Sequence, residues 1–246
     1  LSLAARSASE LEETAFECRK LGSEVLVTPT DVTDIEQVER LVDATVLRYA
    51  AVDILVNNAG IAGPIGGLPE NDVAAWINTI QVNLIGTYLC CRAVVPVMKR
   101  NGSGRIVNLS GAGATNAWAN MSAYCSSKAA VVRLTEVLAL ELADTGITVN
   151  ALGPGSVHTR MWDELTESAA EAGAAQIYET GLRVQAGGGS PIKRCADLAV
   201  WLAGDETRAL SGRMISAFSD DFESMATSIP DIMASDLYTL RRAEPS

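Results

Sequence analysis

The sequence predicts an α/β protein built on a doubly wound parallel sheet, with helices covering both faces of the sheet. Short apolar runs rich in β-branched residues alternate with longer stretches of helical period, which is typical of right-handed βαβ units. The run Asp53–Asn57 lacks polar alternation, as expected for a strand buried on both faces. Hydrophobic residues form 48% of the 246-residue chain, which is enough for a sizeable core.

The periodicity places each element in order along the chain. A first strand is expected within Leu1–Ser7, ending near Ala5. Further strands are expected at Val25–Thr28, Val52–Val56, Arg105–Leu109, Thr148–Leu152 and Met214–Ala217. Helices are expected at Ala8–Leu21, Ile35–Tyr49, Val73–Arg100, Ser122–Asp144 and Ala196–Gly204. Because we find no repeat and no convincing linker, residues 1–246 are expected to form one domain.

The composition argues against several classes of partner. A net charge of −11 disfavours nucleic acids and anionic membranes, which bind basic patches. No apolar run approaches the ~20 residues needed to cross a bilayer, so no membrane partner is expected. Five scattered or adjacent cysteines and a single histidine predict no metal site. The cysteines are interpreted as reduced core thiols of a cytoplasmic protein.

Three turns rich in small residues follow predicted strands, at Asn57–Gly60, Ser110–Gly113 and Gly153–Thr159. The carboxyl ends of parallel strands meet at one edge of the sheet, where such folds bind ligands. Small residues allow the backbone to approach a ligand closely. A binding site is therefore expected at this edge.

The motif that points most directly to chemistry is Tyr124-Cys-Ser-Ser-Lys128 at the start of a predicted helix. Residues four apart share a helix face, so the phenol and the ammonium project together. A neighbouring cation is expected to lower the pKa of Tyr124, which can then exchange a proton with a carbonyl or alcohol oxygen. The alternative interpretation is a buried tyrosine with a solvated lysine one turn later.

Together these motifs resemble the short-chain dehydrogenase/reductase family, from Leu1 to about Gly212. The resemblance implies a Rossmann-like, three-layer α/β/α fold and hydride transfer between a nicotinamide cofactor and a carbonyl or secondary alcohol. It implies that Tyr124 is the catalytic acid/base, that Lys128 holds the cofactor ribose, and that Asn83 supports a water-linked proton relay. Besides Tyr124 and Lys128, the implied cofactor-binding residues are Asn57, Ala59, Gly60, Asp31, Val32, Pro154, Gly155, Val157 and Thr159.

Residues at the end of the first strand bear on the choice of cofactor. Where members of the family that use NAD carry an acidic residue, this chain has Ala5, followed by Arg6 and Ser7. An arginine fork and a hydroxyl suit the 2′-phosphate, so NADP(H) is favoured over NAD(H). Alternatively, Arg6 is a solvated charge before a helix capped near Ser7 or Ser9.

The chain departs from the family pattern at the catalytic serine. The corresponding position is Gly111, with Ser110 one residue earlier. Strand residues alternate faces, so Ser110 should point away from the substrate unless the following loop absorbs the offset. We expect Ser110 to be the catalytic serine, with Thr115 and Ser122 as possible substitutes.

Two further departures concern the ends of the chain. The family's first strand, glycine-rich turn and helix have no counterpart before Leu1, so we expect an N-terminally incomplete copy. The sheet would then have a gap between the strands ending near Ala5 and Asn57. Residues 160–190 occupy the place of the substrate lid, and the candidate substrate contacts are Met161, Trp162, Ile177, Tyr178 and Leu182. The alternative for each of them is ordinary packing of an amphipathic helix. The apolar spacing of residues 219–246 predicts that this tail folds onto the body or onto a partner subunit.

The expected function is therefore an NADP(H)-dependent oxidoreductase acting on a small, apolar carbonyl or alcohol. The family usually pairs through helices corresponding to Val73–Arg100 and Ser122–Asp144, which implies a homodimer or homotetramer. Two alternatives remain. One is a catalytically impaired nucleotide-binding or regulatory protein, in which Gly111 marks a lost serine. The other is a structural subunit of an oligomer.

Overall fold

The computed structural model describes residues 1–242. Its strands form two sheets, and the strands within each sheet are parallel. Strands β1 (Ser2–Ala5) and β2 (Leu26–Pro29) pair with each other. Strands β3 (Ile54–Asn57), β4 (Gly104–Leu109), β5 (Ile147–Gly153) and β6 (Met214–Ser216) form a second sheet in that order. The parallel pairing confirms the predicted fold class.

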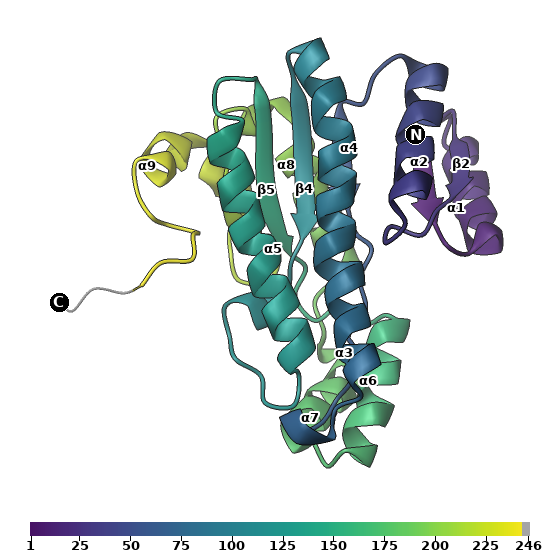
Figure 1. Ribbon diagram of the computed structural model, residues 1–246. Helices are drawn as coiled ribbons and strands as arrows, with labels where there is room; N and C mark the ends of the chain where they lie inside the picture. The colour runs from purple at the N-terminus through teal and green to yellow at the C-terminus, as the bar shows by residue number, and fades with distance from the viewer. Residues whose placement is uncertain (243–246) are drawn as a thin grey trace.

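Helices cover both faces of the larger sheet (Figure 1). On one face lie α4 (Gly86–Asn101) and α5 (Ser122–Glu141), and on the other lies α8 (Ile192–Ala203). Adjacent residues of β4 show why. Ile106 packs with apolar residues of α4, whereas Val107 packs with Leu198 of α8. Because successive strand residues point to opposite faces, both are fully buried, and the result is a three-layer arrangement.

The first two helices flank the β1–β2 pair and begin at polar caps. The Ser7 hydroxyl accepts a hydrogen bond from the amide of Glu10 and caps α1 (Ala8–Lys20), as predicted. The Asp34 carboxylate accepts bonds from two amides at the start of α2 (Ile35–Tyr49). Such caps satisfy amide groups that have no partner within the helix.

The helix predicted at Val73–Arg100 is divided into three parts. It consists of α3 (Val73–Ile80), one π-helical turn (Gln81–Ile85) and α4. Taken together, Val73–Asn101 is long and apolar enough to cross a membrane, so the expectation that no segment reaches this length is wrong. In this structure α4 instead packs against α2, β3 and β4, as a core helix does.

The sheet is interrupted between β1 and β3, which do not pair with each other within residues 1–242. The interruption lies where a gap is predicted from the sequence. Its consequence corrects another expectation, because β3 is not buried on both faces. Ile54 and Val56 are 49% and 45% exposed, since one face of this edge strand has no covering layer. The expectation that the family's first strand belongs in this interruption stays a prediction.

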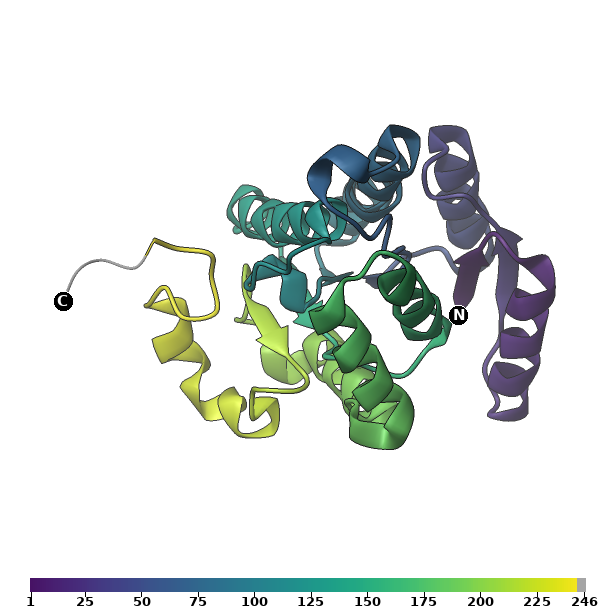
Figure 2. The ribbon, with the colours of Figure 1, turned by 90° about the horizontal axis from the view of Figure 1, so that it is seen from below.

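The remaining elements lie at the carboxyl edge of the sheet and beyond β6. Helices α6 (Arg160–Glu171) and α7 (Ala175–Arg183) cross this edge and lead into a π-helical turn, Val184–Gly188 (Figure 2). Short 3-10 turns occupy Leu68–Glu70, Ala112–Ala114 and Asp205–Thr207. After β6 come the 3-10 helix Phe222–Ser228 and α9 (Ile229–Met233).

The C-terminal tail folds onto the body of the protein, as one of the two predicted arrangements requires. Phe222, Met225, Ile229 and Ile232 are buried in one cluster with Leu198 and Leu202 of α8. The predicted tail extends to residue 246, and residues 243–246 lie outside the described part of the chain.

Candidate active site

Helix α5 brings Tyr124 and Lys128 to the carboxyl end of β4. The Lys128 Nζ lies 5.8 Å from the centre of the Tyr124 ring and donates a 2.9 Å hydrogen bond to the Leu109 carbonyl. Only 5% of Lys128 is exposed. The solvated lysine of the alternative interpretation is therefore wrong: Lys128 is buried, and the Tyr124 ring beside it is partly buried.

Burial sets the ionisation of both groups. Removal from water raises the pKa of Tyr124 to about 12, and the neighbouring Cys125 adds to this effect. It lowers the pKa of Lys128 to about 8. The expectation that Lys128 lowers the pKa of Tyr124 is therefore wrong for this structure. The Lys128 ammonium donates to a backbone carbonyl, and burial is the largest influence on the pKa of the phenol.

Asn83 is fixed by hydrogen bonds on both sides of its amide. Its Oδ1 accepts from the Ile61 amide at 2.8 Å, and its Nδ2 donates to the Ile61 carbonyl and to Ser127 Oγ, each at 2.9 Å. The π-helical turn carries Asn83 to this position, facing α5 and the loop after β3. Asn83 is fully buried, so its orientation is set before any ligand binds.

Gly60 connects Asn83 and Lys128. A Cβ at this glycine would lie 3.3 Å from Asn83 Oδ1 and 3.4 Å from Lys128 Nζ. The backbone after β3 therefore runs directly beside both polar groups, and a larger residue would crowd them. Three sequence-predicted residues meet here.

Gly111 lies directly against the Tyr124 hydroxyl. A Cβ at Gly111 would be only 2.5 Å from Tyr124 Oη. Ser110 points elsewhere: it is 2% exposed, and its hydroxyl donates a 3.2 Å hydrogen bond to the Lys128 carbonyl within α5. Within residues 1–242 the Ser110 hydroxyl forms no hydrogen bond with Tyr124, so the loop does not bring it to the phenol. The structure does not support its expected catalytic role.

The two substitute hydroxyls are also engaged elsewhere. Ser122 Oγ accepts from the Trp76 indole at 3.0 Å, at the start of α5. Thr115 is exposed, and its hydroxyl donates to the Ala112 carbonyl at 3.4 Å. Neither hydroxyl is bonded to Tyr124 in the described structure.

The residues predicted to bind the adenosine part follow β1 and β2. Arg6 is exposed at the end of β1, and its charge contributes to the lowered pKa of Asp31, after two stronger hydrogen bonds from Thr33. Ser7 is used as the α1 cap. Val32 packs against Gly86 of α4, where a Cβ would lie 2.6 Å from its Cγ2. These residues lie along the interrupted part of the sheet.

Asn57 is buried and its side chain is used in hydrogen bonds within the protein. Its amide donates to Asn108 Oδ1 at 2.8 Å and to Cys91 Sγ at 3.3 Å, and Asn108 in turn donates to Thr135 at 2.9 Å. This buried network links β3, β4, α4 and α5. Ala59 is exposed in the loop that follows. This network was not predicted from the sequence, although the polar residues Asn57 and Asn108 within otherwise apolar strands could have indicated it.

The segment after β5 turns sharply at Gly155, whose φ is +74°. Pro154 and Val157 are partly exposed, and Thr159 is exposed at the start of α6. Next to Thr159, Arg160 forms a 3.1 Å ion pair with Glu10 of α1, which connects the lid to the β1–β2 unit. His158 is bonded to Asp163 at 3.0 Å. This contact ties the turn after β5 to α6.

A small cavity of about 40 Å³ lies between Tyr124 and the lid. Of the predicted lid contacts, Met161 and Trp162 line it together with Gly111. Ile177 instead is 2% exposed inside the lid's own core, and Tyr178 and Leu182 are exposed. Within residues 1–242 no group of three or more metal-ligating side chains is found.

The parallel sheet, with a tyrosine–lysine helix and a buried asparagine at its carboxyl edge, defines a Rossmann-like protein of the kind that binds dinucleotides. The family model described as short chain dehydrogenase matches residues 1–170. The chain belongs to this family.

Relatives and solved structures agree with this assignment. The (2S)-[(R)-hydroxy(phenyl)methyl]succinyl-CoA dehydrogenase subunit BbsD of Thauera aromatica is 44% identical over 165 residues. That match covers 65% of this chain and 64% of the relative, so the chain spans less than two thirds of it. A crystal structure of actinorhodin polyketide ketoreductase with NADPH is 33% identical in sequence, with a TM-score of 0.78. The match covers 87% of this chain and 84% of the ketoreductase chain. NAD⁺-bound xylitol dehydrogenase is 27% identical and covers 87% and 86%, with a TM-score of 0.80.

Proposed function

We propose that this protein is an NADP(H)-dependent oxidoreductase that transfers a hydride between the nicotinamide and a carbonyl or secondary-alcohol carbon. The observation that supports this most directly is the cluster of Tyr124, Lys128, Asn83 and Gly60 at the carboxyl edge of the sheet. The names of the relatives, which include a CoA-ester dehydrogenase and a polyketide ketoreductase, point to the same chemistry.

The residues present fit a nicotinamide cofactor. Lys128 Nζ can donate three hydrogen bonds, and one is used by the Leu109 carbonyl. Gly60 lies beside this nitrogen, since a Cβ at Gly60 would come within 3.4 Å of it. A ribose hydroxyl is a suitable acceptor for such donors. When bound, the cofactor supplies the hydride.

The chain's own residues would manage the proton. With its pKa raised, Tyr124 keeps its proton at neutral pH and can donate it to the oxygen of a carbonyl substrate. Lys128 holds the ribose beside it. Asn83 is hydrogen-bonded to the Ile61 backbone and to Ser127. It would thereby fix the loop after β3 relative to α5, as a water-linked proton relay requires.

The preference for NADP(H) rests on Arg6 and Ser7. Arg6 is exposed at the carboxyl end of β1 and its guanidinium is a planar donor of the kind that binds phosphate. An opposing influence is Asp31, whose carboxylate lies close enough for Arg6 to lower its pKa. Titration of the chain with NADPH and with NADH tests the preference, and equal affinity for both would contradict it.

A second function is favoured by Gly111. Among residues 1–242 no side-chain hydroxyl is hydrogen-bonded to Tyr124 Oη, and Ser110 donates to the Lys128 carbonyl. A protein that binds the nucleotide without turnover is therefore the alternative, acting as a regulatory or structural subunit. We also expect self-association through α4 and α5, whose outer faces expose Tyr88, Val137 and Leu140, into a dimer or tetramer measurable by light scattering.

Substitution of Tyr124 by phenylalanine tests the proposed reaction. Loss of the phenol proton should lower kcat with a ketone substrate by about 100-fold or more, while NADPH affinity stays within twofold. Steady-state NADPH oxidation and a fluorescence titration measure the two quantities. Tyr49→Phe, at the last residue of α2, is the matched control. Unchanged turnover in Tyr124→Phe would remove Tyr124 from the mechanism, and tight NADPH binding by an inactive wild-type chain would favour the alternative.

A further inference from the structure

A second, larger cavity lies at the carboxyl ends of β5 and β6. Its volume is about 620 Å³, within the range of small-molecule sites. Its walls come from the loop after β4, the turn after β5, the π-helical turn of the lid and the tail. Ala112, Gly155 and Ser156 line both this cavity and the small one beside Tyr124. The two spaces therefore adjoin along one wall.

The tail forms the outer wall of this cavity, through Tyr238, Thr239 and Leu240. Its backbone is tied to the sheet, since the Met214 amide of β6 donates a 2.8 Å hydrogen bond to the Tyr238 carbonyl. This contact covers part of the outer edge of β6, which would otherwise be open. The larger cavity is thus enclosed by segments that lie far apart in the sequence.

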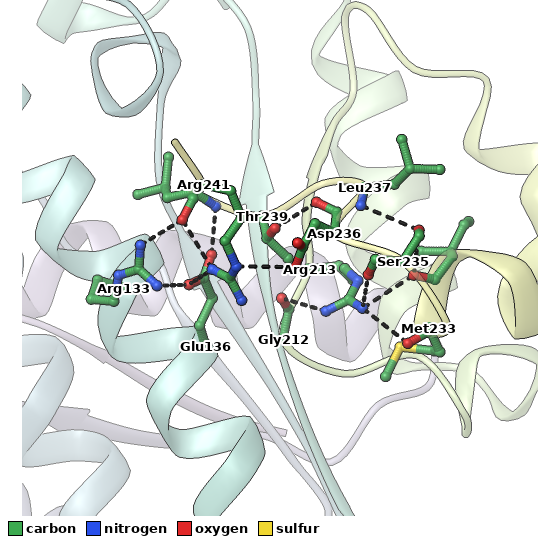
Figure 3. Close-up of polar contacts among 12 residues, drawn as sticks. Arg133, Glu136, Gly212, Arg213, Met233, Ser235, Asp236, Leu237, Thr239 and Arg241 are labelled. Atoms are coloured by element: carbon green, nitrogen blue, oxygen red, sulfur yellow. Dashed lines mark hydrogen bonds and ion pairs between the residues drawn. The ribbon is translucent and has the colours of Figure 1, made fainter. Parts of the chain in front are cut away.

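A buried carboxylate on α5 holds the end of this wall (Figure 3). Glu136 is 6% exposed, accepts a hydrogen bond from the Leu240 amide at 2.7 Å, and pairs with Arg241 at 3.0 Å and with Arg133. Arg213 donates to the carbonyls of Ile232 and Ser235 at 3.1 and 3.0 Å. These contacts fix the tail against the body without using any group of the candidate active site.

The polar lining of the larger cavity contains two groups without a partner in the described structure. Ser190 is 8% exposed, and its buried hydroxyl has no hydrogen-bond partner. Arg183 is exposed, forms no ion pair among residues 1–242, and is the one basic residue of the lining. The one acidic residue of the lining, Asp220, accepts a 2.7 Å bond from the Ser216 amide and is used to hold the turn after β6.

We propose that this cavity is the subsite for the distal part of an extended substrate that ends in an anionic group. The reacting carbonyl would lie beside Tyr124, and the distal chain would pass Gly155 into the larger cavity. There Arg183 would pair with the anion and Ser190 would donate a hydrogen bond. This assignment rests on the proposed oxidoreductase function and adds the substrate class to it.

The chemistry of the lining supports an anion more than a neutral end. A buried hydroxyl without a partner and an unpaired guanidinium are both donors, and donors favour carboxylate or phosphate oxygens. The carboxylate of Asp220 already has an amide donor. The remaining volume would hold the aliphatic or acyl part of the substrate.

Three ketones test the proposal: butanone, a long straight-chain methyl ketone that ends in a carboxylate, and the methyl ester of that acid. In the wild type, KM for the carboxylate should be lower than KM for the ester. Arg183→Gln should raise the ratio of the carboxylate KM to the ester KM roughly tenfold, as loss of a charge-assisted pair predicts. Ser190→Ala should raise it less. Arg40→Gln, at an exposed arginine of α2, is the control and should leave the ratio unchanged.

The wall is tested separately through Glu136. Glu136→Gln should loosen the tail and raise KM for both long ketones relative to butanone, with kcat preserved. Trypsin cleavage near Arg241 would report the loosened tail independently of activity. An unchanged KM ratio in a variant whose tail is released would overturn the role of the wall.

A binding measurement separates this proposal from the proposed function. The saturated carboxylate of the same length cannot be reduced, and its affinity is measured by calorimetry. Binding that Arg183→Gln weakens would support the subsite even if no ketone is turned over. Turnover of butanone, with no effect of chain length or charge and no binding of the carboxylate, would overturn the subsite and leave the oxidoreductase function intact.

Discussion

At the scale of single residues, Tyr124 and Lys128 behave differently from free side chains because Lys128 is buried and Tyr124 is partly buried. Their pKa values move toward the neutral forms, to about 12 for the phenol and about 8 for the amine. The sequence motif predicts that the two groups are neighbours. It does not predict this direction for the tyrosine, because burial depends on the lid and on Gly111 rather than on the helix that carries both residues.

Lys128 makes stability depend on pH. Its pKa falls from 10.5 in the unfolded chain to about 8 in the folded one, so between these values the unfolded state binds more protons. The free energy of unfolding should therefore rise with pH, by about 2 kcal/mol between pH 8 and 9.5. Urea unfolding of the wild type and of Lys128→Met measures this, and the variant should lack this part of the rise.

The control for this experiment is Lys99→Met, which removes an exposed lysine from α4. It should keep the wild-type dependence on pH. If Lys128→Met and the wild type gave parallel curves between pH 7 and 9.5, the amine would not be desolvated as the structure indicates.

At the scale of elements, the edge strand β3 differs most from its predicted environment. Periodicity identifies Ile54–Val56 as a strand, but cannot tell whether a neighbour covers it. Val56 and Val107 make this plain, because they are register partners on adjacent strands. Val56 is 45% exposed and Val107 is fully buried.

Matched substitutions of these two valines should differ in cost. Val107→Ala removes two buried methyl groups and leaves a cavity, which should lower the free energy of unfolding by about 2–3 kcal/mol. Val56→Ala should cost less than about 1 kcal/mol, because its side chain is already half in water. Chemical denaturation of both variants measures the difference. Equal costs would show that β3 is covered in solution.

At the scale of the whole molecule, the β1–β2 unit is joined to the larger sheet by the packing of α2 against α4 and by a few further side-chain contacts. Val32 packs against Gly86, Arg92 pairs with Glu39 at 3.2 Å, and Arg160 pairs with Glu10 at 3.1 Å. The two ion pairs lie on the surface and contribute little to stability. No backbone pairing between β1 and β3 connects the two parts within residues 1–242.

Hydrogen exchange should therefore divide the chain into two classes. The residues of β5 are buried throughout, whereas those of β1 and β2 are partly or fully exposed. Amides of β4 and β5 should exchange at least 10-fold more slowly than amides of β1 and β2, because local opening of the smaller unit breaks fewer contacts. Mass spectrometry of exchanged peptides resolves these segments, and uniform protection would contradict the division.

The local structure and much of the chemistry of this protein follow from short stretches of sequence. The helix at Ile35–Tyr49, the Ser7 cap and the pairing of Tyr124 with Lys128 depend on residues close together in the chain, so periodicity and spacing predict them. The tertiary structure decided the rest. The orientation of Ser110, the exposure of Val56, the raised pKa of Tyr124 and the Glu136 contacts of the tail arise between distant segments. Burial and long-range hydrogen bonds exist only after the layers have packed, and no local pattern encodes them.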